Sequence, residues 1–261
     1  IHFLLNNYNI HHHRNPLLPS NYSFNTFTKL NDMDNMAYID IFFSYLASEI
    51  TLSNKNPSFP IYYGSVNGLG NYMYDISDDI DDYKYHRGFN NQCNKNFKLE
   101  VLDDSDDSDD SDDSDDYSND TVDEDVISKF TNFPIGYLFI EKLEGTLEDI
   151  IKSELSLELL KSCLFQITFA LIYLQKHYQF THNDLHINNV MYTSTNKPFL
   201  YYKYNNQYFK IPTYGKLFKI IDFGRSIFTY RKKTFMNDCF SQYGEAEGQY
   251  VYPLQVNFLH K

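Results

Sequence analysis

The sequence contains no tryptophan and only three cysteines among its 261 residues. Cys93, Cys163 and Cys239 lie far apart, and none belongs to a C-x-x-C pair. This spacing excludes a disulfide framework and a zinc site built on paired cysteines. It is typical of a protein from a reducing compartment.

Long apolar runs are also missing. No stretch approaches the roughly 20 apolar residues of a membrane-spanning helix, and the apolar start at Ile1–Leu5 is too short for a signal-peptide core. We therefore expect a soluble, intracellular, cytoplasmic protein with no membrane partner. The first residue is not Met, which suggests processing, a fragment or an incompletely defined reading frame.

Basic residues are few, with 22 Lys and Arg against 35 Asp and Glu and a net charge of −13. The segment 103–125 holds 14 of the acidic residues and no basic one, so the remainder of the chain is close to neutral. Outside this segment the sequence lacks the density of Lys and Arg that a nucleic-acid groove requires. We expect no nucleic-acid partner.

Residues 75–127 break every periodicity and include an Asp-Asp-Ser repeat over Asp103–Asp116. Such a block buries too little apolar surface to order itself, and its charges repel one another. We predict a disordered acidic insert between two strands. The alternative is a phosphorylatable segment that recruits a basic partner or lies over a binding cleft.

Periodicity is clear in Asp34–Thr51, where apolar residues recur at intervals of three and four and predict an amphipathic helix. Pro57–Pro60 ends this helix, and Ile61–Val66 has the composition of a strand. Gly64–Gly70 does not follow the G-x-G-x-x-G spacing, so a hairpin turn is favoured there over a phosphate-binding loop.

Residues 1–34 are rich in Asn and predict an irregular segment with one strand near Phe24–Leu30. The run His11–His13 is interpreted as a solvated polar tract rather than a metal site, because neighbouring side chains do not face one point. Lys29 is the one lysine ahead of the helix.

Further along, Pro134–Glu141 predicts a short buried strand with a flexible exit at Lys142–Gly145. Ser156 can cap a helix that continues to Tyr178. The apolar face predicted for this helix consists of Leu160, Cys163, Leu164, Ile167, Leu171 and Leu174. The Tyr-rich segment Tyr192–Gly215 predicts an extended hairpin.

The most informative stretch is Thr181–Asn189, with Ile220–Gly224 following it. Phosphoryl transfer needs a carboxylate near the attacking hydroxyl, an amide oxygen that reaches a metal ion, and a second carboxylate from another segment. Asp184, Asn189 and Asp222 supply this set. Since Mg²⁺ prefers oxygen ligands and keeps some waters, Asn189 and Asp222 with ATP phosphate oxygens would complete its shell. The other interpretation is a polar turn, which Asp and Asn favour.

These motifs match the H-x-D-L-x-x-x-N and D-F-G signatures, and the chain from about Phe59 to Tyr250 resembles the protein kinase superfamily. The resemblance implies a mixed α+β, two-lobed fold that uses ATP and Mg²⁺. Residues 35–140 would form a small β-rich lobe with one regulatory helix and the acidic insert. Residues 141–261 would form the hinge and an incomplete, mainly helical large lobe with the catalytic loop and activation segment.

The resemblance also implies roles for individual residues. The main chain of Glu141 and Leu143 would bond to adenine, and Asp184 would orient the attacking hydroxyl. His182 would be a packing and hydrogen-bonding residue, not a base. Lys29 is the candidate for the phosphate-binding lysine, and its acidic partner is Asp40 or Glu49.

The sequence departs from the family pattern in several places. No Gly-rich loop precedes Lys29. Asn183 stands where most protein kinases have arginine, which argues against switching through a phosphorylated activation segment. His186 stands where serine/threonine kinases have lysine, and the D-L-H form is similar to haspin-like kinases and to aminoglycoside and choline phosphotransferases. Arg225–Tyr250 is similar to an activation segment without the A-P-E ending.

The chain ends near the point where the later helices of the large lobe would begin, so a truncated kinase is expected, similar to kinase-like proteins of large DNA viruses. Such a protein would lie in the host cell or the virion. The leading function is ATP-dependent phosphorylation of Ser or Thr in a protein substrate. The alternatives are a catalytically dead pseudokinase that acts as a binding module, and a small-molecule kinase of the aminoglycoside or choline phosphotransferase type.

Overall fold

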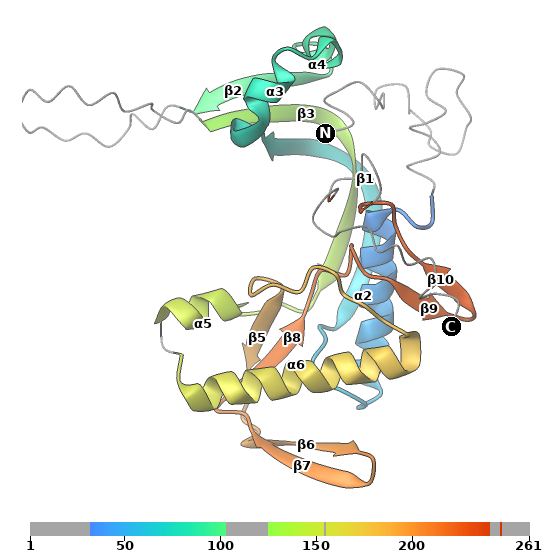
Figure 1. Ribbon diagram of the computed structural model, residues 1–261, viewed down its shortest axis with the longest axis vertical. Helices are drawn as coiled ribbons and strands as arrows, with labels where there is room; N and C mark the ends of the chain where they lie inside the picture. The colour runs from blue at the N-terminus through green and yellow to red at the C-terminus, as the bar shows by residue number, and fades with distance from the viewer. Residues whose placement is uncertain (1–31, 103–124, 154, 241–245, 247–261) are drawn as a thin grey trace, which may run out of the picture. The chain divides into compact units, whose positions relative to one another are not determined.

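The computed structural model describes residues 32–102, 125–153, 155–240 and 246, and shows a mixed α+β protein with small sheets and few helices (Figure 1). The chain divides into two compact units. One includes Asn67–Ile135, and the other includes Met33–Val66 and the chain from Gly136 onward. Lys29, the His run, the predicted strand at Phe24–Leu30 and the Asp-Asp-Ser repeat lie outside the described residues.

The first unit contains a three-stranded sheet in the order β1-β3-β2. Its strands are β1 (Tyr62–Asp75), β2 (Phe97–Leu102) and β3 (Asp125–Ile140), of which β1 and β3 continue into the second unit. Three short helical elements connect β1 to β2. They are η2 (Ser77–Asp79), α3 (Ile80–Tyr83) and α4 (Arg87–Gln92).

The prediction of disorder over residues 75–127 is wrong for residues 77–102, which form these elements. The physical reason is a local aromatic core: Phe97 packs between Phe89 and Phe130, with ring centroids 5.1 and 5.5 Å away. All three side chains are almost fully buried. The acidic bias of the neighbouring repeat masked this apolar content.

Two local predictions about the strands are also wrong. The glycine-containing run Gly64–Gly70 lies inside β1 and is not a hairpin turn, because β1 pairs with β3. Pro134–Glu141 was expected to be buried, but Tyr137 and Phe139 on β3 are exposed. Apolar composition alone does not distinguish a buried strand from one with an open face.

The second unit begins with α2 (Met36–Leu52), which confirms the predicted helix. The Asn35 side chain caps it by accepting a hydrogen bond from the Ala37 N–H, at 3.0 Å. One face of α2 enters the core through Ile39, Phe43, Leu46, Ala47 and Ile50.

Two helices follow β3, namely α5 (Leu147–Ser153) and α6 (Leu157–Tyr178). Ser156 caps α6 as predicted, since its hydroxyl oxygen accepts from the Leu159 N–H at 3.1 Å. The predicted apolar face is partly wrong: Leu164 is 56% exposed, and the buried face instead includes Gln166. The Gln166 amide oxygen accepts from the Phe218 N–H at 2.9 Å, so a polar side chain joins the helix to a strand.

Contrary to the sequence expectation, α6 has the length and apolar composition of a membrane span. Core helices of soluble proteins share these properties. In this structure Cys163, Ala170 and Leu174 of α6 are part of the hydrophobic core.

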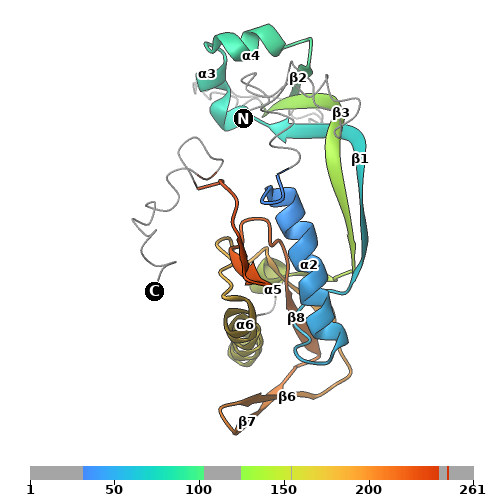
Figure 2. The same cartoon turned by 90° about the vertical axis from the view of Figure 1, so that its right-hand side faces the viewer.

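Beside α6 lies a three-stranded sheet in the order β4-β5-β8, made of β4 (Gly145–Thr146), β5 (Val190–Ser194) and β8 (Lys216–Ile220). The predicted extended hairpin is present as β6 (Phe199–Tyr204) and β7 (Gln207–Pro212), which leave β5 and return to β8. Both views show the hairpin along one side of α6 (Figures 1 and 2). There Tyr202 packs on Phe169, with ring centroids 4.7 Å apart.

The strands β9 (Phe228–Tyr230) and β10 (Lys233–Phe235) form a separate two-stranded sheet against α2. At the centre of this region Phe43 is completely buried among other rings. Its ring centroid lies 4.6 Å from Phe180, 5.0 Å from Phe223 and 4.5 Å from Phe228. The core of the second unit therefore converges on this one side chain.

Replacing Phe43 with Ala should destabilise the protein by about 3–5 kcal/mol, because the change removes a buried ring and leaves a cavity among three others. Leu52→Ala is the matched control, since Leu52 lies on the same helix but is 54% exposed, and it should change stability by less than about 1 kcal/mol. Urea unfolding followed by circular dichroism measures both. Equal losses in the two variants would contradict the central role of Phe43.

Candidate functional site

The loop that contains Asp184 is held at its start by a short bridge. Thr181 donates its N–H to the Ile227 carbonyl and accepts from the Ile227 N–H, at 2.8 and 2.9 Å. Next to this bridge His182 is buried between Phe180 and Phe223. The loop is thus attached both to the aromatic core and to the segment that follows Asp222.

His182 connects the two motif segments. Its Nε2 donates to the Ile221 carbonyl at 3.1 Å, and its Nδ1 accepts from the Asp184 N–H at 3.3 Å. These partners require the neutral imidazole, since a protonated ring could not accept from an N–H. Burial lowers the pKa of His182, which also favours the neutral imidazole. The structure thus agrees with the packing and hydrogen-bonding role that the sequence analysis gave to His182.

Asn189 closes the loop. Its amide nitrogen donates to the Asp184 carbonyl at 2.9 Å and contacts His186 Nε2 at 3.1 Å. Because the nitrogen is used inside the loop, the amide oxygen is the group left for a cation. Asn189 is buried, so its side chain is held in one orientation.

Pairing of β5 with β8 brings Asp222 to the end of this loop. Val190 lies opposite Ile220 in the antiparallel register, and the Ile221 N–H donates to the Asn189 carbonyl at 3.1 Å. Asp222 is the next residue and adopts a φ of 60°, a left-handed conformation that Asp tolerates better than most residues. Asp184, Asn189 and Asp222 therefore lie around one region. The carboxylates of Asp184 and Asp222 are both close enough to His182 to interact with it electrostatically.

Asp40 of α2 is a third carboxylate at this site. One of its oxygens accepts from the Phe223 N–H at 2.8 Å. Burial, and then the nearby Asp222 charge, raise the pKa of Asp40 to about 6. The sequence left Asp40 and Glu49 as alternatives; the structure brings Asp40 to the motif, whereas Glu49 is exposed on the same helix.

Arg225 is a residue of the site that the sequence analysis missed. Its guanidinium lies 3.2 Å from Asp184, with both side chains about one-quarter exposed. Asn183 supports it, since its amide nitrogen donates to the Arg225 carbonyl at 2.9 Å. A cation directly after the D-F-G motif is the signal that sequence reading could have used.

The predicted adenine-binding residues lie at the end of β3. The Glu141 N–H is already donated to the Ile61 carbonyl at 2.8 Å, so the Glu141 carbonyl is the main-chain group left for a ligand. Within the described residues, no main-chain hydrogen bond uses the Leu143 N–H. Both groups suit the donor and acceptor edge of adenine. A small pocket lined by Pro60, Leu138, Ile140 and Asp222, among others, lies next to this segment.

Magnesium fits the donor chemistry of the site but would need further ligands. In the part of the chain that the structure describes, no group of three or more His, Cys, Asp or Glu side chains could hold a metal ion. Asp222 and Asn189 offer two oxygen ligands, the type that Mg²⁺ prefers, and phosphate oxygens and water would supply the rest. The position of Lys29 stays a prediction, because it lies outside the described residues.

The raised pKa of Asp40 has a consequence for stability. A carboxyl whose pKa is higher in the folded state favours folding when protonated, and this contribution is lost as the pH rises through about 4 to 6. Asp40→Asn cannot ionise, so in magnesium-free buffer its stability relative to the wild type should rise by up to about 3 kcal/mol between pH 4 and pH 7.5. Glu49→Gln is the control on the exposed face of α2. Chemical denaturation at several pH values measures the difference, and a pH-independent difference for Asp40→Asn would contradict the burial of its charge.

Comparison with known proteins gives partial matches. No protein-family model matches the chain. A probable serine/threonine-protein kinase of Dictyostelium discoideum is 40% identical over 91 residues, covering 31% of this chain and 8% of that protein. Serine/threonine-protein kinase haspin of Mus musculus is 32% identical over 104 residues, covering 40% of this chain and 13% of that protein. The matched regions are a small part of both relatives, and they support a kinase-like relationship for part of this chain.

Proposed function

We propose that the protein is an ATP-dependent protein kinase that transfers the γ-phosphoryl group to Ser or Thr hydroxyls of a protein substrate. The observation that carries the proposal is the β5–β8 register, which brings Asn189 and Asp222 together at the end of the loop that holds Asp184. The partial similarity to two serine/threonine kinases supports the same reaction class. The two-lobed kinase fold and an intracellular location are parts of this proposal.

In this mechanism Asp184 orients the substrate hydroxyl and receives its proton. The hydroxyl oxygen attacks the γ-phosphorus, the bond from the γ-phosphorus to the β–γ bridging oxygen breaks, and ADP leaves with the electron pair. Asn189 and Asp222 would hold magnesium, which would neutralise phosphate charge. Arg225, 3.2 Å from Asp184, offers a further positive charge where negative charge develops on the transferred group.

The nucleotide base is recognised by the main chain of Glu141 and Leu143. Asp40, already bonded to the Phe223 N–H, would be the acidic partner of a phosphate-binding lysine, for which Lys29 is the candidate. This arrangement gives each of the predicted site residues a distinct role.

A pseudokinase is the second candidate. It is favoured by one observation: no Gly-rich loop precedes Lys29, the candidate for the phosphate-binding lysine. A protein without that lysine could bind nucleotide and still fail to transfer phosphate. The two candidates therefore separate on turnover rather than on binding.

Asp184→Ala should lower phosphate transfer by about 100-fold or more while Mg·ATP still binds, because a group that accepts the proton typically contributes 10²–10⁴-fold.

Asp222→Asn should abolish binding of Mg·ATP, because it removes the charged metal ligand. Transfer from radiolabelled ATP to a mixture of protein substrates, and thermal shift with Mg·ATP, measure the two effects. Glu49→Gln is the control for both.

Three results would contradict the proposal in different ways. Binding without any transfer by the wild type would identify a pseudokinase. Transfer to an aminoglycoside or choline, but not to protein, would identify a small-molecule kinase. Unchanged Mg·ATP binding by Asp222→Asn would remove the metal role of that residue.

A further inference from the structure

Lys219 is a buried charged residue that the proposed chemistry leaves unexplained. It lies on β8, three residues before Asp222, and its side chain is 4% exposed. Its ammonium group donates to a carboxylate oxygen of Glu141 at 2.7 Å and to the Phe59 carbonyl at 3.1 Å. Lysine is almost never fully buried unless it is paired, and here Glu141 is the partner.

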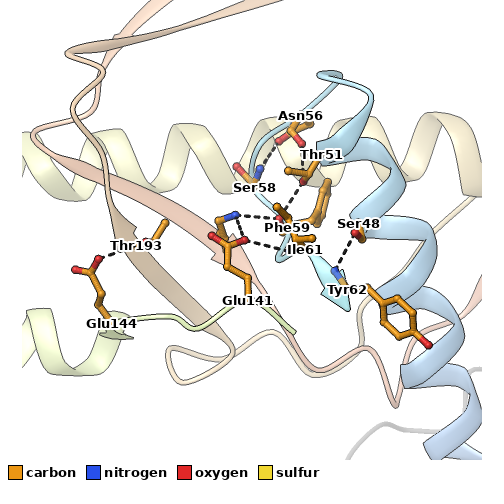
Figure 3. Close-up of polar contacts among 11 residues, drawn as sticks. Ser48, Thr51, Asn56, Ser58, Phe59, Ile61, Tyr62, Glu141, Glu144 and Thr193 are labelled. Atoms are coloured by element: carbon orange, nitrogen blue, oxygen red, sulfur yellow. Dashed lines mark hydrogen bonds and ion pairs between the residues drawn. The ribbon is translucent and has the colours of Figure 1, made fainter. Parts of the chain in front are cut away.

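Glu141 forms two hydrogen bonds with Ile61, one through its side chain and one through its main chain, as Figure 3 shows. Its carboxylate also accepts from the Ile61 N–H at 3.1 Å, and its own N–H donates to the Ile61 carbonyl at 2.8 Å. The side chain and the main-chain N–H of Glu141 are therefore both hydrogen-bonded to Ile61, which fixes the orientation of this residue and leaves its carbonyl for a ligand.

The segment between α2 and β1 is the common anchor. The Ser58 carbonyl accepts from the Ile220 N–H at 3.0 Å, and the Phe59 carbonyl accepts from the Thr51 hydroxyl at 2.9 Å as well as from Lys219. One short stretch of chain is thus bonded to β8, to α2 and to the residue that follows β3. Figure 3 shows its bonds to α2 and to Glu141.

An ion pair with Lys219 buried and Glu141 only 21% exposed is a costly way to fill this space, because both charges lose most of their contact with water and an apolar pair of the same size often gives equal stability. The charged pair has a geometric requirement that an apolar pair lacks. The Lys219 ammonium group fits only where both of its acceptors lie within hydrogen-bonding distance. The pair therefore constrains distances that apolar packing would leave adjustable.

We propose that Lys219 and Glu141 are positioning residues that set the separation between the adenine-binding main chain, Glu141 to Leu143, and the metal ligand Asp222. This inference rests on the proposed function. Lys219 lies on β8 and Asp222 lies two residues beyond the end of that strand, so the pair joins the two halves of the nucleotide site over at most about 10 Å. Neither residue touches the reacting atoms.

The test compares two ligands, adenosine and the Mg²⁺ complex of AMP-PNP, by isothermal titration calorimetry. Adenosine reports on the adenine-binding segment alone, whereas Mg·AMP-PNP requires both halves at their correct separation. In the wild type, Mg·AMP-PNP should bind more tightly than adenosine. We define the affinity ratio as the dissociation constant for adenosine divided by that for Mg·AMP-PNP. A high ratio indicates that the two halves are well aligned.

The informative variant is the double replacement Lys219→Met with Glu141→Gln, which removes both charges. Glutamine can still accept from the Ile61 N–H, and the Phe59 carbonyl keeps the Thr51 hydroxyl, so both of these main-chain groups keep a partner. We expect its melting temperature without ligand to stay within a few degrees of the wild type. Its affinity for adenosine should change by less than threefold, and the affinity ratio should fall at least tenfold.

Two further variants keep the test decisive. Glu141→Gln alone retains an oxygen for Lys219 and should lower the ratio by a smaller factor, which covers the case in which the double variant does not fold. Lys216→Met is the control, since Lys216 lies on the same strand, with its ammonium group over the Tyr192 ring. It should leave the ratio unchanged.

A wild-type ratio in the folded double variant would overturn the positioning role while leaving the proposed function intact. Failure of the wild type to bind Mg·AMP-PNP would overturn the proposed function, and this inference with it. A loss of affinity for adenosine equal to that for Mg·AMP-PNP would also overturn the positioning role, because it would indicate a general disturbance rather than lost alignment.

Discussion

The antiparallel pairing of β5 with β8 is the constraint on which the candidate site depends. It places Asn189, at the end of one motif, against Ile221, directly before the other. A shift of one residue in this register would turn every side chain of β8 to the opposite face. Lys219 would then leave its partly buried carboxylate partner, and Ile220 would leave the core, so the register is specified by charge and by packing together.

The charges around the motif residues are unevenly matched. Asp40, Asp184 and Asp222 bring three carboxyl groups to the region, and Arg225 is paired with one of them. Burial makes the remaining negative charge costly, as the raised pKa of Asp40 indicates. A region with this balance favours a bound cation, in agreement with the oxygen ligands that it presents.

The predictions that succeeded rest on short-range patterns. Caps and periodicity identified α2 and α6. The shared chemistry that the spacing of Asp184, Asn189 and Asp222 indicates stays a prediction. The failures have long-range causes. Pairing with β3 decides that Gly64–Gly70 is strand, and the contact with Phe130 decides that the region around Phe97 is folded. The sequence analysis did not identify Lys219, because its ion-pair partner Glu141 lies 78 residues away along the chain.

The hairpin of β6 and β7 leaves the sheet between β5 and β8 and turns at Asn205 and Asn206, both with positive φ. The register of β5 and β8 is set by their own pairing and by Gln166, not by the length of this excursion. The hairpin can therefore grow or shrink through evolution, or accept an inserted tag at its tip, while the arrangement of Asn189 and Asp222 is inherited unchanged.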